Sequence, residues 1–496
     1  MKKKPNLVVI FTDQQRYDTM AVYGNNKIRT PGLNRLAAES TVFEKAYVSQ
    51  PVCTPSRATI MTGLYPHNHH CQVNSRPLNG EIPTLVEQLA DPEYRSAYIG
   101  KWHIGNEIKR QHGFDEWVTT EDNYFNEFDD PDSKGHCSYY YHLLGKGFHP
   151  DQYSKKKDSY IFSRYFCTRL PEQYSKEAYQ AAEAVRFIRR NKDGSFILYV
   201  NFLDPHGPNY SVYDDLYDPG EVNLSPAFDL EPSEDIPTRC KLNRRYYAEI
   251  SQDDQPFNGV LKSEADYRRL TARYWGQVSL VDKYTGVILD ALKENGVEDD
   301  TIVAFTSDHG DMLGDFRMAA KSVLFDKAVR VPLLIKIPGR TSGNVIKEPV
   351  SLVDLVPTLL EAMGSEGIKK MDGKSLYSVV VGDETPGNND VFVQWYGDNG
   401  LKKWVTLYSD PEERKRLTEL CSAGVRMLVT RDGWRLSLSE NGENELYNLN
   451  EDPYETKNLY YTGRCQDIVE ELSGRILRWQ KQYGDSAVLL MGREGG

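Results

Sequence analysis

Four short polar stretches hold most of the side chains in this sequence that could do chemistry. Each follows an apolar run, and they read Thr12-Asp13-Gln14, Gly100-Lys101-Trp102-His103, Asp204-Pro205-His206-Gly207 and Ser307-Asp308-His309-Gly310-Asp311. The first and the last of these stretches offer candidate metal ligands, namely Asp13, Gln14, Asp308 and His309. Two carboxylates would balance the charge of a divalent cation, and carboxylate, amide and imidazole groups are all common metal ligands.

The other two stretches add positive or proton-donating groups. Lys101, His103 and His206 come from them, and Lys321 is a further candidate later in the chain. A metal ion combined with lysines and histidines makes an anion site that suits a sulfate or phosphate group.

Residues 51–63, PVCTPSRATIMTG, place Cys53 just before a predicted helix. Pro55 favours the first turn of a helix, so a helix over about residues 56–62 would direct its free N–H groups at the cysteine. A helix N-terminus favours anions, which leaves two interpretations: a reactive thiolate, or a cysteine that is modified into another group. The other six cysteines are irregularly spaced, without a CxxC pair, and are expected to be reduced thiols.

The elements that must position these residues follow from the hydrophobic pattern. Continuous apolar runs rich in β-branched residues predict strands buried on both faces, at residues 6–12, 96–100, 196–203, 301–307 and 331–337. Helical patterns lie between them, at residues 30–39, 175–190, 266–294 and 351–363. The alternation predicts an α/β fold with a mostly parallel central sheet flanked by helices. The polar stretches would then meet at the carboxyl edge of that sheet.

A change of pattern after residue 373 predicts a second domain. Short strands at residues 391–395, 426–430, 434–438 and 445–449 precede a helix at residues 466–483. We expect a catalytic domain over residues 1–375 and a smaller α+β domain with an antiparallel sheet over residues 376–496. Between residues 123 and 166, aromatic and charged residues without a clean period predict a surface excursion. Its tyrosines, including Tyr124, Tyr139, Tyr140, Tyr141 and Tyr153, either stack on a sugar ring or serve loop packing or a subunit contact.

The net charge and the apolar segments of the chain indicate which kinds of binding partner to expect. The 496 residues are 39% hydrophobic and carry 60 Lys and Arg against 72 Asp and Glu, a net charge of −12. This acidic balance argues against non-specific nucleic-acid binding, which needs clustered positive charge. The basic start at residues 2–4 is followed by an apolar run too short for a signal peptide, and no segment reaches the ~20 apolar residues of a membrane span. A cytoplasmic protein is therefore expected.

Residues 53–63 and residues 98–103 each resemble a signature of a known protein family. Cys53-Thr54-Pro55-Ser56-Arg57, followed by Ala58 and Thr62-Gly63, resembles the first signature of the type I sulfatases, which belong to the alkaline phosphatase superfamily. Tyr98-Ile99-Gly100-Lys101-Trp102-His103 resembles the second. In the family's order, the similarity also covers Asp13, Pro205-His206, Ser307-Asp308-His309-Gly310-Asp311, Lys321, Asp452-Pro453-Tyr454-Glu455 and Asn458-Leu459. It therefore spans nearly the whole chain.

The resemblance implies an alkaline phosphatase-like fold and a sulfuric ester hydrolase acting on a sulfated sugar or small organic sulfate. It implies that a formylglycine-generating enzyme oxidises Cys53 to formylglycine, whose hydrate attacks sulfur and later expels sulfate. One divalent metal, Ca²⁺ by default, would be bound by Asp13, Gln14, Asp308, His309 and the residue at position 53.

The resemblance also implies roles for the remaining site residues. Asp308 would help to deprotonate the nucleophile, and Arg57 and Lys101 would hold it. His103 would be the base that releases sulfate. His206 and Lys321 would bind the sulfate oxygens and stabilise or protonate the leaving alcohol.

The metal ligands depart from the usual family pattern. Many sulfatases have two adjacent aspartates and an Asp-Asn pair, whereas this chain has Asp13-Gln14 and Asp308-His309. Since imidazole suits manganese better than calcium, Mn²⁺ is the alternative metal. The same pattern is associated with phosphonate monoester hydrolases, so a phosphonate or phosphate ester hydrolase is an alternative. A non-catalytic anion- or glycan-binding relative with unoxidised Cys53 is another. The sequence leaves the natural substrate and the formation of a homo-oligomer open.

Overall fold

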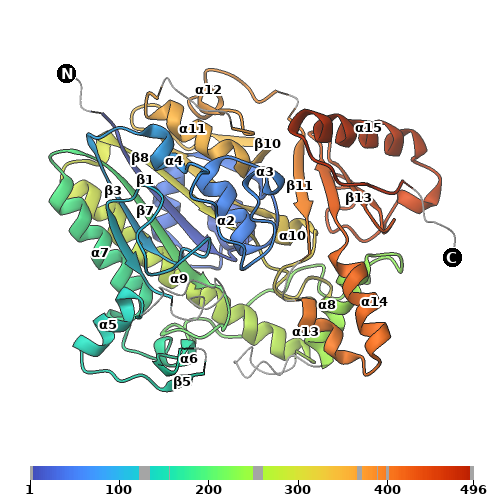
Figure 1. The fold of residues 1–496 in the computed structure, drawn as a ribbon, viewed down its shortest axis with the longest axis horizontal. Coiled ribbons are helices and arrows are strands. Elements are labelled where there is room, and N and C mark those ends of the chain that lie inside the picture. Colours follow the sequence, from blue (N-terminus) through green and yellow to red (C-terminus); the bar gives the residue numbers. More distant parts are fainter. Residues whose placement is uncertain are drawn as a thin grey trace.

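A large sheet with helices on both faces forms the body of the protein in this computed structural model (Figure 1). The structure describes residues 4–121, 135–155, 157–249, 261–365, 371–387, 389–397 and 401–491. The sheet has eight strands in the order β10-β2-β9-β8-β1-β7-β3-β4. Their bounds are β1 (Asn6–Asp13), β2 (Thr41–Tyr47), β3 (Tyr94–Gly100), β4 (Glu116–Thr119), β7 (Ser195–Pro205), β8 (Thr301–Ser307), β9 (Arg330–Lys336) and β10 (Val345–Ser351).

The sheet is mostly parallel, as the sequence predicts. The five neighbours β8, β1, β7, β3 and β4 pair in parallel, and β9 is antiparallel to both β8 and β2. The apolar runs correspond to β1, β3, β7, β8 and β9. The sequence prediction omits β2, β4 and β10, which have polar residues in their strands, and β4 and β10 are the two edges of the sheet. Edge strands carry polar residues and proline because one side of their backbone faces no neighbour.

The two faces of β1 lie in two different hydrophobic clusters. Leu7, Val9 and Phe11 belong to one cluster, and Val8 and Ile10 belong to the other. Residues of α1 (Pro31–Ala38), α7 (Lys176–Asn191) and α9 (Glu264–Glu294) complete the second, while α2 (Cys53–Thr62) and α11 (Leu355–Ala362) contribute to the first. Since successive strand residues point to opposite faces, helices on both faces explain why these strands read as continuous apolar runs.

The C-terminal region builds a second, antiparallel sheet, as predicted. Its order is β11 (Val391–Trp395), β12 (Val425–Val429), β13 (Trp434–Ser439) and β14 (Glu445–Asn448), and α15 (Gln466–Tyr483) packs on it (Figure 1). Two helices precede β12, namely α13 (Leu401–Trp404) and α14 (Pro411–Ser422), and α14 contacts α8 (Thr238–Glu249). The division of the chain between residues 375 and 376 stays a prediction.

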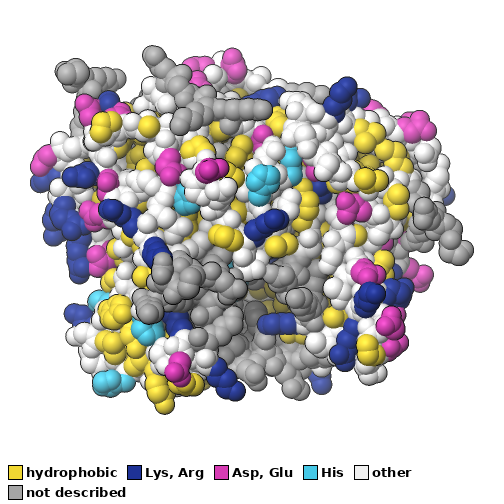
Figure 2. Space-filling model, in the orientation of Figure 1, with side chains coloured by type: hydrophobic (Ala, Val, Ile, Leu, Met, Phe, Trp, Pro, Cys, Tyr) yellow, Lys and Arg dark blue, Asp and Glu magenta, His cyan; other side chains and the backbone are white. Residues whose placement is uncertain are grey.

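The predicted surface excursion contains short elements. They are α5 (Ser138–Gly145), β5 (Gln152–Ser154), β6 (Ser159–Ile161) and α6 (Arg164–Cys167). Figure 2 shows hydrophobic side chains gathered over α5 and β5, and Tyr141, Tyr153 and Tyr160 are about half exposed. Tyr139, by contrast, is buried, and Tyr124 lies outside the described residues.

Further short segments are α3 (Pro66–His69), α4 (Leu85–Leu89), α10 (Asp326–Val329) and α12 (Tyr377–Val380). Among the described residues, no helix combines the length and the apolar character needed to cross a bilayer.

Candidate active site

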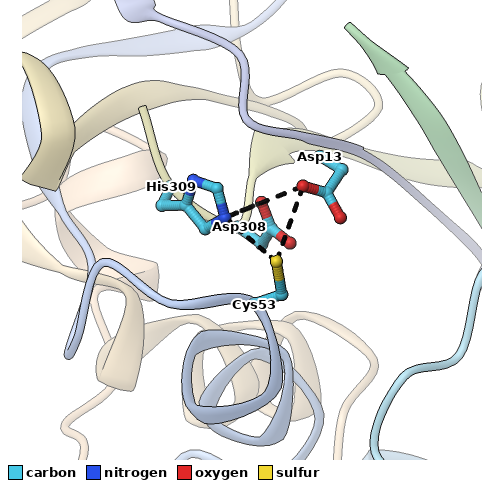
Figure 3. Close-up of side chains that lie close together, drawn as sticks. All are labelled: Asp13, Cys53, Asp308 and His309. Carbon is cyan, nitrogen blue, oxygen red and sulfur yellow. Dashed lines mark hydrogen bonds and ion pairs between the residues drawn. The ribbon is translucent and has the colours of Figure 1, made fainter. Parts of the chain in front are cut away.

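The four polar stretches meet at one edge of the large sheet. Asp13 ends β1, Lys101 follows β3, His206 follows β7 and Asp308 follows β8, and these four strands are direct neighbours. Cys53 faces them as the first residue of α2. Figure 3 shows Asp13, Asp308 and His309 turned toward the sulfur of Cys53. The predicted convergence of strand ends is therefore present.

Helix α2 begins at Cys53 itself, three residues before the predicted start. Pro55 fits inside this first turn because the N–H groups there have no partner within the helix. The Thr54 amide N instead donates to Asn74 Oδ1 at 3.1 Å, and the Thr54 hydroxyl donates to the carbonyl of His103 at 2.7 Å. The helix start is thereby tied to the stretch after β3.

Arg57 joins three of the strand ends. Its Nη2 lies 2.7 Å from Asp13 Oδ2, its Nε lies 2.9 Å from Asp308 Oδ2, and its Nη1 donates to the Lys101 carbonyl at 2.9 Å. Lys101 Nζ contacts the same Asp13 oxygen at 2.6 Å. All four side chains are at most 1% exposed. Buried charges persist only when they are paired in this way, so these residues form a rigid floor.

Four donor groups could hold a metal ion. Cys53 Sγ lies 3.3 Å from His309 Nε2 and 3.8 Å from Asp13 Oδ1, and His309 Nε2 lies 3.5 Å from Asp308 Oδ1. The donor atoms of Asp13, Cys53, Asp308 and His309 all lie within 4.8 Å of one another. One ion with bonds of ~2.0–2.6 Å can bridge such a set, and its two carboxylates match a divalent charge. The residues therefore fit the predicted metal.

The fifth predicted ligand, Gln14, lies beside this group. Its Oε1 accepts from Lys321 Nζ at 2.7 Å, its Nε2 donates to Asp311, and its backbone N–H donates to Asp308 Oδ1 at 3.0 Å. Its backbone is left-handed, with φ of 70°, a conformation that costs a non-glycine residue ~1 kcal/mol or more.

The two carboxylates differ in electrostatic surroundings. Burial alone would raise the pKa of Asp13, but Lys101, His206, Arg57 and Lys321 hold it well below its usual value. Burial and the neighbouring Asp13 charge raise the pKa of Asp308 to about 6. Asp13 is thus the permanent anion, and Asp308 is the carboxylate closer to exchanging a proton near neutral pH.

The histidines flank the floor. Burial and the charge of Lys101 lower the pKa of His103, and burial and the charge of Lys321 lower that of His206. His103 is buried in a left-handed conformation, with φ of 57°. His206 is half-buried, and its Nδ1 lies 2.7 Å from the Gly207 carbonyl oxygen and 3.4 Å from Arg164 Nη1.

Three residues that position the site were not predicted. Asn201 Oδ1 accepts from Arg57 Nη1 at 2.6 Å, Asn74 accepts at the start of α2, and Glu107 accepts the backbone N–H groups of Trp102 and His103 at 2.9 and 2.7 Å. Asn201 carried a signal, since it is a polar residue inside an apolar strand. Asn74 and Glu107 carried none, because their partners are backbone groups brought close by the fold.

Comparison with known proteins agrees with this geometry. The family model described as Sulfatase matches residues 5–365, and the model for the C-terminal part of N-sulphoglucosamine sulphohydrolase matches residues 314–420. An ulvan-active sulfatase of Formosa agariphila is 30% identical over 75% of this chain and 63% of its own length. An N-acetylglucosamine-6-O-sulfatase of Bacteroides thetaiotaomicron is 26% identical over 98% of this chain and 88% of its own.

Among solved structures, a phosphonate monoester hydrolase from Silicibacter pomeroyi has the same fold. It superposes with a TM-score of 0.78 at 22% identity, over 97% of this chain and 96% of that chain. The Sulfatase match covers well over half of the 496 residues. The chain therefore belongs to the sulfatase family, the sulfuric ester hydrolases of the alkaline phosphatase superfamily that its two signatures resemble.

Proposed function

We propose that this sulfatase hydrolyses the sulfate ester of a sulfated sugar or a small organic sulfate, with formylglycine made from Cys53 and one divalent metal ion. The observation that carries the proposal is the place of Cys53. It begins α2, and its sulfur lies 3.2 Å from Lys321 Nζ and 3.3 Å from His309 Nε2, above the charged floor. The family implies both a metal and a cysteine-derived formylglycine.

Asp13, Asp308, His309 and the residue at position 53 would hold the metal, with Gln14 beside them. When bound, a divalent ion would polarise an oxygen of the ester and offset its negative charge. Calcium is the family's usual ion. The imidazole of His309 favours a transition metal, and Mn²⁺ is therefore the alternative.

The floor would prepare the nucleophile. Oxidation by the formylglycine-generating enzyme would remove the sulfur of Cys53 and leave an aldehyde, and hydration of that aldehyde would place two hydroxyl groups on the side-chain carbon that now carries the sulfur. Asp308 would accept a proton from the attacking hydroxyl, because its carboxylate lies within 4.8 Å of the donor atom at position 53. Arg57 and Lys101 are fixed by Asp13 and hold the geometry during attack.

Lys321, His206 and His103, which we call the rim, would bind the ester and transfer protons to and from it. Lys321 is only partly buried and contacts Cys53, so its ammonium can pair with a sulfate oxygen. His206 is half-buried, and from there it would stabilise or protonate the leaving alcohol. His103, whose carbonyl accepts from the Thr54 hydroxyl at the start of α2, would accept the proton whose loss releases sulfate. A formylglycine-generating enzyme is the partner that maturation requires.

A saccharide substrate is supported by two relatives, one named as active on ulvan and one named an N-acetylglucosamine-6-O-sulfatase. The half-exposed tyrosines of the excursion provide aromatic surface of the kind that sugar rings contact.

Phosphonate or phosphate ester hydrolysis is the second candidate. Its specific support is the ligand pair Gln14 and His309, where many sulfatases have aspartate and asparagine. The solved phosphonate monoester hydrolase is similar in fold only and does not decide between the two.

Two measurements on protein from its native host test the proposal. The mass of the peptide containing Cys53 should show the aldehyde, and phenyl sulfate should be turned over faster than phenyl phosphonate. The reverse preference would favour the second candidate. An unmodified cysteine, together with no turnover of either ester, would leave a non-catalytic anion-binding relative.

A further inference from the structure

The backbone of Gln14 is held on both sides by buried side chains. Its N–H donates to Asp308 Oδ1 at 3.0 Å, and its carbonyl accepts from the hydroxyl of Tyr274, which belongs to α9 and is 1% exposed. That hydroxyl also accepts from the Arg16 amide at 2.9 Å, so it ties together two residues of the turn that follows β1. These contacts keep Gln14 in its left-handed conformation. The starting point of its side chain is therefore fixed.

The side-chain amide of Gln14 lies between a cation and an anion. Its Oε1 accepts from Lys321 Nζ at 2.7 Å, and its Nε2 donates to Asp311 Oδ2. Turning the amide over would place its NH₂ group against the ammonium and its oxygen against the carboxylate, and both contacts would then be repulsive. The charges on the two sides therefore decide which end of the amide carries the oxygen.

Asp311 is itself held in place by the loop around it. It is 4% exposed, and its Oδ1 accepts the backbone N–H groups of Leu313 at 2.6 Å and of Ala320 at 3.1 Å. Because these two donors fix Oδ1, the place of Oδ2 against Gln14 is fixed as well. Ala320 directly precedes Lys321 in the chain. One carboxylate thus sets the position of the amide and of the segment that carries its ammonium partner.

The oxygen of the Gln14 amide is on the side of the candidate metal ligands. Lys321 Nζ, which contacts this oxygen, lies 3.2 Å from Cys53 Sγ and 3.9 Å from Asp13 Oδ1. Cys53 and Asp13 both belong to the set of donor groups that could hold an ion. An amide binds a divalent ion through its oxygen, since its NH₂ group is a hydrogen-bond donor only. The orientation of the amide therefore decides whether Gln14 can be a ligand.

We propose that Asp311 is a positioning residue, which turns the Gln14 amide so that its oxygen can join the metal ligands. The inference rests on the proposed function and deepens it, because it assigns Gln14 as an oxygen ligand and gives Asp311 a role toward the metal. It also accounts for an amide at position 14, where many sulfatases have a second aspartate. A carboxylate that reached Asp311 from this position would meet a like charge.

The test is a double-mutant cycle on metal affinity. Titration calorimetry measures the binding of Ca²⁺ and of Mn²⁺, each alone, to protein from its native host after treatment with EDTA and dialysis. Asp311→Asn keeps the shape of the side chain and sets an NH₂ group against that of Gln14, whereas Gln14→Ala removes the amide. Asp282→Asn is the matched control, because Asp282 is also buried and also accepts two backbone N–H groups, from Gly32 at 3.1 Å and Leu33 at 2.6 Å.

We expect Asp311→Asn to weaken the binding of the ion ~10–100-fold, as the loss of a group that orients a metal ligand does elsewhere. The Gln14 amide then turns its oxygen toward the new NH₂ group and away from the ion. In the Gln14→Ala background, the same substitution should change the affinity less than ~2-fold, since no amide remains to be turned. Gln14→Ala alone should also weaken binding, and Asp282→Asn should leave it unchanged.

Wild-type affinity in Asp311→Asn or in Gln14→Ala would overturn the inference. So would an equal loss from Asp311→Asn in both backgrounds, which would make the role of Asp311 structural, or an equal loss in Asp282→Asn, which would make it an effect of any buried charge. If Asp311→Asn does not fold, Asp311→Ser replaces it with the same expectations, because serine removes Oδ2 and keeps one acceptor for the backbone.

The proposed function is tested apart from this cycle. Turnover of 4-nitrophenyl sulfate by the wild-type protein reports on that function, and its absence would refute the function while the affinities still decide the role of Asp311. Binding of neither ion by the wild-type protein would overturn the inference, because Gln14 would then have no ion to bind.

Discussion

Two buried clusters of charged residues in this protein differ in whether their positive and negative charges balance. The floor of the candidate active site contains Asp13, Arg57, Lys101 and Asp308. A second cluster, which we call the charge lock, contains Arg239, Arg435, Glu445 and Glu455. Every one of these eight residues is at most 2% exposed. Burial of charge is costly in both places, and the difference lies in how that cost is offset.

The charge lock is closed. Arg435 pairs with Glu445 and Glu455, and Glu455 Oε2 also accepts the Asp326 amide at 2.8 Å. Arg239 lies on α8 and Asp326 begins α10, whereas Arg435 belongs to β13. Two positive and two negative charges balance, and the cluster joins the C-terminal sheet to the rest of the chain. Glu455 lies in the DPYE stretch of the family resemblance, which is thereby given a structural role.

The floor is open. Its two carboxylates face Arg57 and Lys101, and Lys321 adds a third cation 3.9 Å from Asp13. The surplus of positive charge suits a site that binds an anionic ester, and the two carboxylates beside Cys53 and His309 suit a divalent ion. The comparison teaches that burial and ion pairing alone do not mark an active site. Unbalanced charge beside a reactive side chain does.

The largest expected effect comes from the floor. Cys53→Ser should lower kcat for 4-nitrophenyl sulfate by ~10⁴-fold or more, as loss of a nucleophile does elsewhere. Serine carries one hydroxyl on the carbon where hydrated formylglycine would carry two, so the melting temperature should change little. Activity assays and calorimetry on the same preparation check both parts. A Cys53→Ser enzyme with near wild-type kcat would rule out the formylglycine.

A change in the charge lock should lower stability and leave activity unaltered, the reverse of the result expected for the floor. Glu455→Ala leaves buried Arg435 without one of its partners, which should lower the free energy of unfolding by ~3–5 kcal/mol. The activity of the molecules that remain folded should be unchanged. Urea unfolding measures the first quantity, and kcat at low temperature measures the second.

Glu451→Ala is the control for the charge lock, because Glu451 is exposed a few residues away and its loss should cost under ~0.5 kcal/mol. A Glu455→Ala protein with full stability and no activity would place the charge lock in the catalytic machinery and undo the comparison.

Glu107 is a buried acidic residue near the floor that should make the stability of the folded protein depend on pH. Burial raises its pKa to about 7 in the folded chain, against 4.5 for the ordinary group, although it accepts two backbone N–H groups. The folded protein thus binds this proton more tightly than the unfolded chain, so the contribution to stability is present below pH ~4.5 and is lost as pH rises through about 7.

Glu107→Gln removes that titration. Between pH 5 and pH 8, the difference in unfolding free energy between variant and wild type should move in the variant's favour by ~3 kcal/mol. Urea unfolding of both proteins at the two pH values measures it. A constant difference would show that Glu107 is ionised throughout.

The sequence predicts those parts of the fold and of the candidate site that leave a local pattern in the chain. The strands β1, β3, β7 and β8 were predictable because helices cover both of their faces, so their residues are apolar without interruption. Asp13, Lys101, His206 and Asp308 stood out for a related reason, since each is a polar residue placed at or soon after the end of such a run, whereas Cys53 and Arg57 lie in a helix. The start of α2 was predicted at about residue 56, directly after Pro55, whereas the helix begins at Cys53 and Pro55 lies inside its first turn.

Other features depend on contacts between distant parts of the chain. Glu107 and Asn74 act through backbone groups, and nothing in their own sequence neighbourhood indicates this. The edge strands β4 and β10 take polar residues because of their place in the sheet. The charge lock has the same origin, since Arg239 and Glu445 are about two hundred residues apart and only the fold brings them together.

The smallest expected effect lies at the hairpin of β5 and β6. Tyr153 and Tyr160 are paired across the two strands with ring centres 5.5 Å apart, and they are 48% and 59% exposed. If they contact a glycan, Tyr153→Ser with Tyr160→Ser should weaken retention in a native gel containing ulvan by ~3–10-fold, since each aromatic contact is worth ~0.5–1.5 kcal/mol.

The double change should leave both the unfolding free energy and 4-nitrophenyl sulfate turnover unaltered, because the rings are exposed and lie outside the floor. Leu477→Ser, which removes an exposed apolar side chain from α15, is the control. A loss of stability or a change in oligomeric state would instead assign the pair to loop packing or to a subunit contact. Either result separates the two interpretations that the tyrosine-rich sequence leaves open.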